Sequence, residues 1–375
     1  MMFEEIIAQE IPKEILQKAL QKKRLPSAFL FYGPDGIGKK TLSLLFAKAL
    51  NCKETQKIVD NPKKIDNEAS RVHQSPPESS SGSNHQSQIS HPQSGYPKSQ
   101  IPCGVCSSCM KIDSRNHPDV RIIEPESKGK REISIEVIRE LRREVGMKPF
   151  EGKKRIYLLF YVDRMSLEAS NAFLKTLEEP PLDTLFILTS TRPNFLLPTI
   201  LSRCQKIRFN RLNRKEVARA LEDRFNASPE KAELLSRLSQ GELGLAIELL
   251  RDEFFLSRGR FSDFFFDLPN KSHLEVLDFV EEQDALESVT FLFSLYRDLL
   301  LLKTSSSEGQ NGDGIGLIEN PDILSHLKDL EETLSLEEIL SRIEELERGW
   351  VALQGSVNPR LILSLFLFKH LQRND

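Results

Sequence analysis

Short apolar runs alternate with stretches of helical spacing over the first 210 residues of the chain. The runs that predict strands are Ala28–Tyr32, Val120–Ile123, Ile156–Val162, Leu185–Ser190 and Ile207–Phe209. The stretches that predict helices or turns between them are Thr41–Leu50, Ile135–Val145, Leu167–Glu179 and Thr199–Ser202. Strands that alternate with helices predict an α/β domain, whose parallel sheet is covered by helices on both faces.

Only helical spacing continues after Phe209. Three amphipathic stretches come first, each bounded by Asn, Ser-Pro or Gly, at Lys215–Phe225, Pro229–Ser239 and Leu243–Arg251. A second helical block begins at Leu274 and is interrupted by a loop at Ser305–Gly316. We therefore expect this half of the chain to be all helix.

One polar segment, residues 54–101, interrupts the first half. It is rich in Ser, Gln and His and has few apolar residues. Such a segment buries too little surface to offset the entropy lost on ordering, so we predict a disordered insertion.

Length and charge narrow the classes of protein. At 375 residues the chain is too long for one ordinary core, so we expect two or three domains. The 52 Lys and Arg nearly balance the 55 Asp and Glu, so nucleic-acid binding would need a local basic face. Lys22–Arg24 and Lys153–Arg155 are candidates, although such runs are more often solvated surface.

The compartment is predicted from cysteines and apolar runs. Five cysteines, three of them closely spaced, favour a reducing cytoplasm and a bound metal over disulfides. No stretch is long and apolar enough to span a membrane, and the N-terminus lacks the pattern of a signal peptide. We expect a cytoplasmic protein without a membrane partner.

The stretch from Gly33 to Thr41 (GPDGIGKKT) resembles a nucleotide-binding phosphate loop. Gly33, Gly36 and Gly38 would let backbone N–H groups surround a phosphate, and Lys39 would reach the β- and γ-phosphates. An ordinary glycine-rich turn with an exposed lysine is the alternative.

The loop departs from the pattern where a hydroxyl should bind Mg²⁺, because that position is Lys40. Thr41 follows one residue later, which on a helix is rotated by about 100°. We therefore expect no catalytic Mg²⁺, and the sequence leaves open whether ATP or ADP occupies the loop.

Cys103, Cys106 and Cys109 are spaced three residues apart, and Cys52 offers a fourth sulfur. Four thiolates are typical of a closed structural zinc site, with no open position for catalysis. The insertion separates Cys52 from the others, so His117 is the alternative fourth ligand, and three free thiols are the alternative to a metal site. We expect Cys204 to pack in the interior.

Several motifs together resemble the AAA+ clamp-loader subunits of bacterial DNA polymerase III. They are LKTLEEPP at 174–181, SRC at 202–204, RLPSAFLFYGP at 24–34, the CxxCxxC cluster, and VNPR at 357–360. The resemblance extends over nearly the whole chain and leaves out only the insertion.

This resemblance implies three domains: an AAA+ nucleotide-binding-like domain at 1–210, with a zinc module at about 52–117; a small helical lid at 211–262; and an all-α collar at 263–375. It also implies assembly with tau/gamma and delta subunits into a hetero-pentamer that loads a sliding clamp on primed DNA.

The resemblance further implies that the chain does not hydrolyse ATP. Family members that do carry two acids at positions that correspond to Phe160 and Tyr161, and Asp163 matches a later acid that is not the metal ligand. The lid arginine of active subunits would fall near Gly244 or Leu245.

By the same resemblance, Arg203 would project into the ATP site of a neighbouring subunit as an arginine finger. The alternative is a surface arginine at a helix end. We expect Glu178 and Glu179 to lie at a subunit interface or in the interior.

Two other functions remain as alternatives. The first is a catalytically active clamp-loader ATPase of the tau/gamma type, which Lys40, Phe160 and Tyr161 oppose. The second is a stand-alone zinc-dependent DNA-binding module, which the near-neutral charge opposes.

Overall fold

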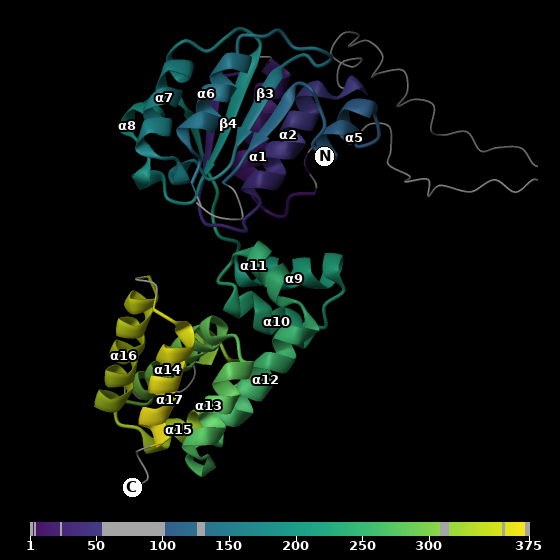
Figure 1. The fold of residues 1–375 in the computed structure, drawn as a ribbon. Helices are drawn as coiled ribbons and strands as arrows, with labels where there is room; N and C mark the ends of the chain where they lie inside the picture. Colours follow the sequence, from purple (N-terminus) through teal and green to yellow (C-terminus); the bar gives the residue numbers. More distant parts are fainter. Residues whose placement is uncertain are drawn as a thin grey trace, which may run out of the picture. The chain divides into compact units, whose positions relative to one another are not determined.

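The computed structural model describes residues 3, 5–22, 25–54, 102–125, 132–307, 315–354 and 357–371. The chain divides into two compact units, Met1–Arg211 and Leu212–Asp375, and each is described by itself (Figure 1). The predicted insertion at 54–101 lies outside the described residues apart from Glu54.

The first unit is built on a five-stranded parallel sheet with the order β2-β3-β4-β1-β5. The strands are β1 (Ala28–Tyr32), β2 (Val120–Ile123), β3 (Arg155–Leu159), β4 (Thr184–Ser190) and β5 (Gln205–Arg208). Ala28 lies opposite Phe186, and Arg155 lies opposite Thr184. The predicted parallel sheet is confirmed.

Helices cover both faces of this sheet. They are α1 (Glu10–Lys22), α2 (Lys39–Asn51), α5 (Ser107–Asp113), α6 (Ile135–Glu144), α7 (Leu167–Glu178) and α8 (Pro198–Arg203), with 3₁₀ turns η3 (Val162–Arg164) and η4 (Pro193–Phe195). Helices α1, α2 and α5 lie on one side, and α6, α7 and α8 on the other (Figure 1).

The alternation of side chains along each strand explains the two layers. Phe29 of β1 points toward α2, where its ring centroid lies 5.7 Å from that of Phe46. Phe186 of β4 points to the other face and lies 5.5 Å from Phe173 of α7. All seven residues of β4 are buried, as expected for a central strand with helices on both faces.

The second unit is helical, which confirms the prediction. Its helices are α9 (Arg214–Phe225), α10 (Pro229–Leu238), α11 (Leu243–Leu249), α12 (Asp252–Phe266), α13 (His273–Glu282), α14 (Ala285–Ser307), α15 (Leu324–Thr333), α16 (Leu336–Gln354) and α17 (Pro359–Leu371), with 3₁₀ turns η5 (Leu268–Asn270), η6 (Ile315–Leu317) and η7 (Pro321–Ile323). Capping boxes at Asn213 and Ser272 start α9 and α13.

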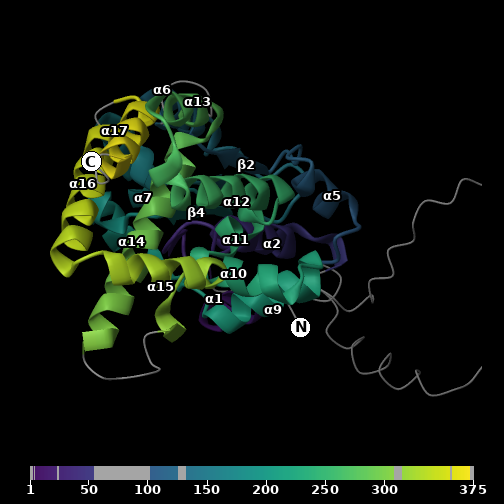
Figure 2. The ribbon, with the colours of Figure 1, turned by 90° about the horizontal axis from the view of Figure 1, so that it is seen from below.

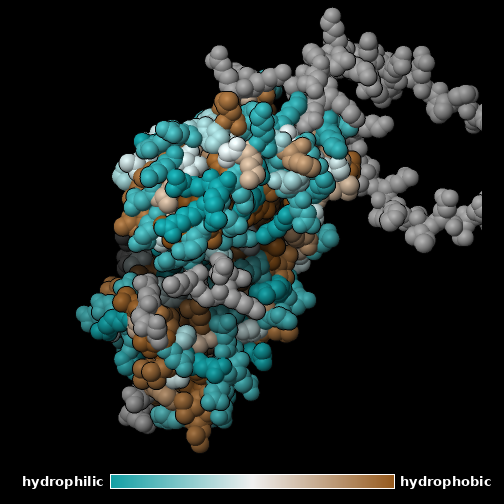
Figure 3. Space-filling view, turned by 45° about the horizontal axis from the view of Figure 1, so that its top comes forward, coloured by the Kyte–Doolittle hydropathy of each residue, from teal (hydrophilic) through white to brown (hydrophobic). Residues whose placement is uncertain are grey.

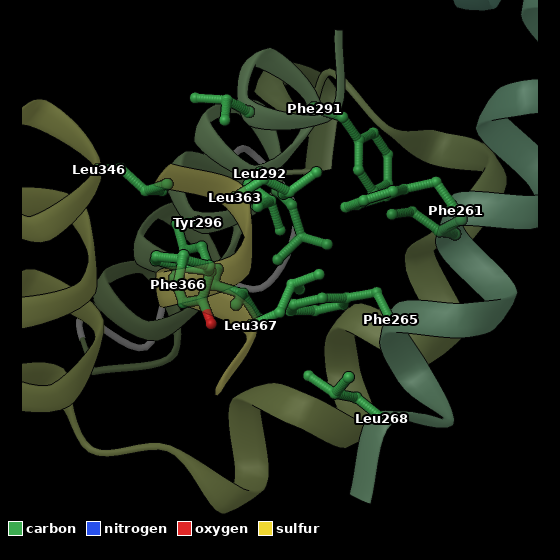
Figure 4. Packing of buried hydrophobic residues seen from close by; sticks show 14 of the residues in the cluster. Phe261, Phe265, Leu268, Phe291, Leu292, Tyr296, Leu346, Leu363, Phe366 and Leu367 are labelled. Atoms are coloured by element: carbon green, nitrogen blue, oxygen red, sulfur yellow. The ribbon is translucent and has the colours of Figure 1, made fainter. Parts of the chain in front are cut away.

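Helices α9, α10 and α11 pack on one another, whereas the later helices share a second core. Leu292 and Tyr296 of α14 lie in this core beside Leu363 and Phe366 of α17 (Figure 4). Helix α17 packs against α13 as well, although the two are far apart in the sequence (Figure 2).

Several elements differ from the prediction, among them β3 and α12, and α1 and α5 were not predicted. Strand β3 ends at Leu159 rather than Val162, because Tyr161 has a left-handed φ of 56° and the chain turns into η3. Helix α12 was not predicted, since its phenylalanines lie on several sides instead of forming one stripe.

Within the described residues, no helix combines the length and apolarity needed to cross a membrane. The face in Figure 3 is largely hydrophilic, with apolar side chains gathered in patches.

Candidate functional site

The phosphate loop lies between β1 and α2, where the sequence placed it. Gly33, Gly36 and Gly38 have positive φ angles of 146°, 65° and 95°. A Cβ on Gly33 would lie 2.3 Å from the carbonyl oxygen of Phe209, so only glycine fits there. The backbone of Phe209, just after β5, therefore packs directly against Gly33 at the start of the loop.

Lys39 is buried and faces the loop itself. Its Nζ donates to the carbonyl oxygen of Gly33 at 2.8 Å and also to that of Pro34. A phosphate in the loop would have to compete with these carbonyl oxygens for the ammonium group. Thr41 is exposed on the first turn of α2.

Lys40 contacts both Phe160 and Tyr161, the residues that the resemblance assigns to the positions of the acids. Its Nζ lies 4.3 Å from the ring centroid of Tyr161 and 5.1 Å from that of Phe160. The same Nζ lies 3.0 Å from a carboxylate oxygen of Glu124, just after β2. A cation over aromatic faces and beside a carboxylate is well stabilised. We call Lys40, Phe160, Tyr161 and Glu124 the lysine cluster.

Neighbouring groups fix the charges of the lysine cluster. Burial would raise the pKa of Glu124, but hydrogen bonds from Arg115 and Lys40 hold the pKa below its usual value. Burial and the adjacent Asp35 raise the pKa of Tyr161 to about 12, and its hydroxyl donates to Asp35 at 3.0 Å. The cluster therefore holds a neutral phenol, an ionised carboxylate and an ammonium group.

Asp163 contacts residues that follow β4. Its carboxylate accepts from the backbone N–H of Thr191 at 3.1 Å and from the Thr191 hydroxyl at 3.0 Å. The Asp163 side chain is fully buried and ties η3 to the end of β4, which is a structural role.

The four cysteines Cys52, Cys103, Cys106 and Cys109 come together, with all sulfurs within 4.8 Å of one another. The Sγ of Cys52 lies 3.5 Å from that of Cys103 and 3.9 Å from that of Cys106. A tetrahedral zinc with bonds of about 2.3 Å separates its sulfurs by about 3.8 Å. This donor set and spacing fit a metal such as zinc.

Burial affects the ionisation of these thiols. A hydrogen bond with Cys52 and burial raise the pKa of the Cys109 thiol, and burial raises that of Cys103. The raised pKa values favour neutral thiols, and a metal that binds there would have to displace the thiol protons.

His117, the alternative ligand, is turned away from the sulfurs. Its Nε2 lies 2.9 Å from the Ser108 hydroxyl, and its Nδ1 accepts from the backbone N–H of Asp119 at 3.1 Å. Burial lowers the pKa of His117. The geometry therefore favours Cys52 as the fourth ligand and leaves His117 as a link between α5 and β2.

Arg203 is exposed at the end of α8. Its guanidinium donates to Glu178 at 2.9 Å and to the carbonyl oxygen of Thr199 at 3.0 Å. Glu178 is half-exposed at the end of α7, so the expectation of an interior position does not hold for it. The guanidinium is held in place at the surface, where another chain could reach it.

Comparison with known proteins decides the family. Residues 8–75 and 85–213 match the family described as DNA polymerase III, delta subunit, which is just over half of the chain. The chain belongs to this family. The resemblance to clamp-loader subunits of DNA polymerase III is thereby confirmed.

Individual relatives agree with this assignment. The DNA polymerase III subunit delta' of Bacillus subtilis (strain 168) is 29% identical over 307 residues, which cover 79% of this chain and 78% of that protein. The subunit tau of the same strain is 24% identical over 394 residues. This match covers 98% of the chain but only 61% of tau.

Among solved structures, a DNA polymerase III gamma subunit-related protein of Thermotoga maritima matches with a TM-score of 0.42 and 19% identity. The match covers 98% of this chain and 99% of that protein.

Sequence reasoning missed two partners in this clamp-loader chain. Glu124 was not singled out, although it pairs with Lys40 at a separation of 84 residues. Glu178 was noted without its contact to Arg203. The available signal was Lys40 itself, because a partly buried lysine at that position needs a carboxylate nearby.

Proposed function

We propose that this chain is a delta-prime-type clamp-loader subunit that does not hydrolyse ATP. It would scaffold the complex and donate Arg203 in trans to a neighbouring ATPase subunit. The observation that supports this proposal most strongly is the lysine cluster, in which Lys40 lies against Phe160 and Tyr161.

The chemistry of phosphoryl transfer explains why this observation carries weight. In P-loop ATPases a Ser or Thr hydroxyl and an acid hold Mg²⁺, and a further residue orients the attacking water. Here the residue at the hydroxyl position is a cation, and two aromatic rings stand where the resemblance puts the acids. Mg²⁺ would be repelled by Lys40 and would find no carboxylate from β3.

The position of Arg203 supports the second half of the proposal. A guanidinium supplied in trans stabilises the charge that develops on the γ-phosphate. Arg203 lies at the surface, and its contacts to Glu178 and Thr199 reduce the conformational freedom it would lose on binding.

We further propose that zinc bound by Cys52, Cys103, Cys106 and Cys109 has a structural role. All four protein ligands would leave no coordination position for water, so the ion would join the end of α2 to α5.

We retain the lid at 211–262 and the collar at 263–375 as proposals. Helix α12 continues through residues 262 and 263, so the boundary would lie within one helix. Leu361 and Leu365, one helical turn apart on α17, are each 54% exposed. They offer an apolar surface for tau/gamma and delta subunits, with which the chain would load a sliding clamp on primed DNA.

The experiment is reconstitution of the complex with tau/gamma, delta and either wild-type or Arg203→Ala chain. We expect assembly to be retained, and DNA-stimulated ATP hydrolysis to fall by about 1000-fold at the one neighbouring site. Arg139→Ala on α6, also an exposed arginine, is the control. Unchanged hydrolysis in a complex that contains Arg203→Ala would rule out the trans role.

A further inference from the structure

A groove of about 810 Å³ in the second unit is lined by residues of α11, α12, α14 and α16. We call its apolar lining residues the floor; they are Leu245, Leu249, Phe254, Phe261, Phe291 and Phe293, together with Leu238, Leu286 and Ile343. Phe261 and Phe291 also belong to the core and meet edge to face at 5.5 Å (Figure 4). These two floor residues are thus part of the packed core, which restricts their movement.

Most of the charged lining residues, which we call the wall, are acidic. Its carboxylates are Glu248, Glu253, Asp284, Glu287, Glu319 and Glu347, against three arginines. Two of these arginines are neutralised within the chain. Arg258 pairs with Asp322 at 3.0 Å, and Arg297 pairs with Asp298 at 3.1 Å and with Glu319 of the groove at 3.3 Å. Glu248, Glu253, Asp284, Glu287 and Glu347 remain beside the single arginine Arg251.

Glu287 illustrates the resulting imbalance. Burial and the neighbouring Asp284 raise its pKa, although Arg251 and Arg258 act in the opposite direction. A positive charge from outside would stabilise this carboxylate. An anionic ligand such as a phosphate or a nucleic acid would be repelled by the same wall.

We propose that the groove binds a basic amphipathic helix of a partner protein. Leu and Phe side chains of that helix would cover the apolar floor, and its Lys or Arg side chains would face the acidic wall. The inference goes beyond the proposed function, because neither the phosphate loop nor Arg203 contributes to the groove.

The probe is a fluorescent synthetic peptide of about 14 residues, with Leu on one helical face and Lys on the other. Fluorescence anisotropy with the full chain should show saturable binding that weakens as salt is added. Glu253→Gln with Glu287→Gln should weaken binding by about fivefold. The matched control is Glu281→Gln with Glu282→Gln, two exposed acids of α13 outside the groove.

A second variant tests the floor. Leu245 is 37% exposed, so Leu245→Ser should weaken binding of the peptide without unfolding the chain. The unfolding temperature, followed by circular dichroism, should stay close to that of the wild type. The proposal is overturned if a Leu–Glu peptide binds as well as the Leu–Lys peptide, or if the wall and control variants bind alike. Absence of saturable binding to the wild type, or a dimer that the wall variant dissolves, would also overturn it.

Discussion

At the scale of single residues, Lys40 alters the candidate nucleotide site most. In the sequence, Lys40 next to Lys39 looks like a single substitution at the hydroxyl position of the loop. In the structure it contacts Phe160 and Tyr161, which follow β3, and Glu124, which follows β2. The three departures that the resemblance implies, at the hydroxyl position and at the two acid positions, therefore lie in contact with one another.

Replacing Lys40 should consequently reduce stability. Lys40→Gln removes the cation from two rings and from Glu124, and we expect the free energy of unfolding to fall by about 1 kcal/mol. Urea unfolding measures it, with Lys18→Gln as control, because Lys18 pairs with Glu14 on an open surface. Equal losses in the two variants would show that the contacts of Lys40 with the rings contribute nothing.

At the scale of elements, Asp119 joins the start of β2 to the loop before β3. Burial would raise the pKa of this carboxyl, but the backbone N–H groups of Phe150, Glu151 and Gly152 donate to it and lower the pKa. Because the folded pKa is below the unfolded one, the stabilisation is present above the unfolded pKa. It is lost as the pH falls through the folded pKa.

Asp119→Asn should therefore cost about 2 kcal/mol of unfolding free energy near pH 6. The difference from wild type should shrink as the pH falls below about 4, the unfolded pKa of Asp. Urea titrations at several pH values give both quantities. A difference that stays constant with pH would contradict the assigned role of the ionised carboxylate.

The zinc module is a second link between elements, since Cys52 follows α2 and Cys109 lies in α5. Wild-type protein should contain about one zinc per chain, and Cys106→Ser should lose it and unfold at a lower temperature. Elemental analysis measures the metal. Cys204→Ser is the control, because Cys204 is buried outside the cluster. A folded wild-type chain without metal would contradict the assignment.

The sequence predicted the elements of the sheet well and their ends less well. The apolar runs located all five strands, and most clearly the central ones, because central parallel strands are buried on both faces. The edge strand β5, in which only Ile207 is buried, was indicated by a shorter run. The end of β3 depends on the left-handed turn at Tyr161, which no apolar pattern reveals. The three clustered cysteines predicted a metal site, but only the fold could place Cys52 beside them in preference to His117.

At the scale of the whole molecule, the candidate functions are distributed over separate surfaces. The lysine cluster lies beside the phosphate loop, Arg203 lies exposed on α8, and the acidic groove lies in the second unit. A single sequence gives little information about which residues contact other chains. The resemblance to clamp-loader subunits supplied the role of Arg203, whereas spacing alone would have left a surface arginine.

The most direct test of the account is ATP turnover by the purified chain in the presence of Mg²⁺, with Lys39→Ala as the reference. The account predicts that the wild type and Lys39→Ala release phosphate at the same background rate, because Lys40, Phe160 and Tyr161 leave no place for the metal. Robust hydrolysis that is lost in Lys39→Ala would contradict it and would favour an active ATPase of the tau/gamma type.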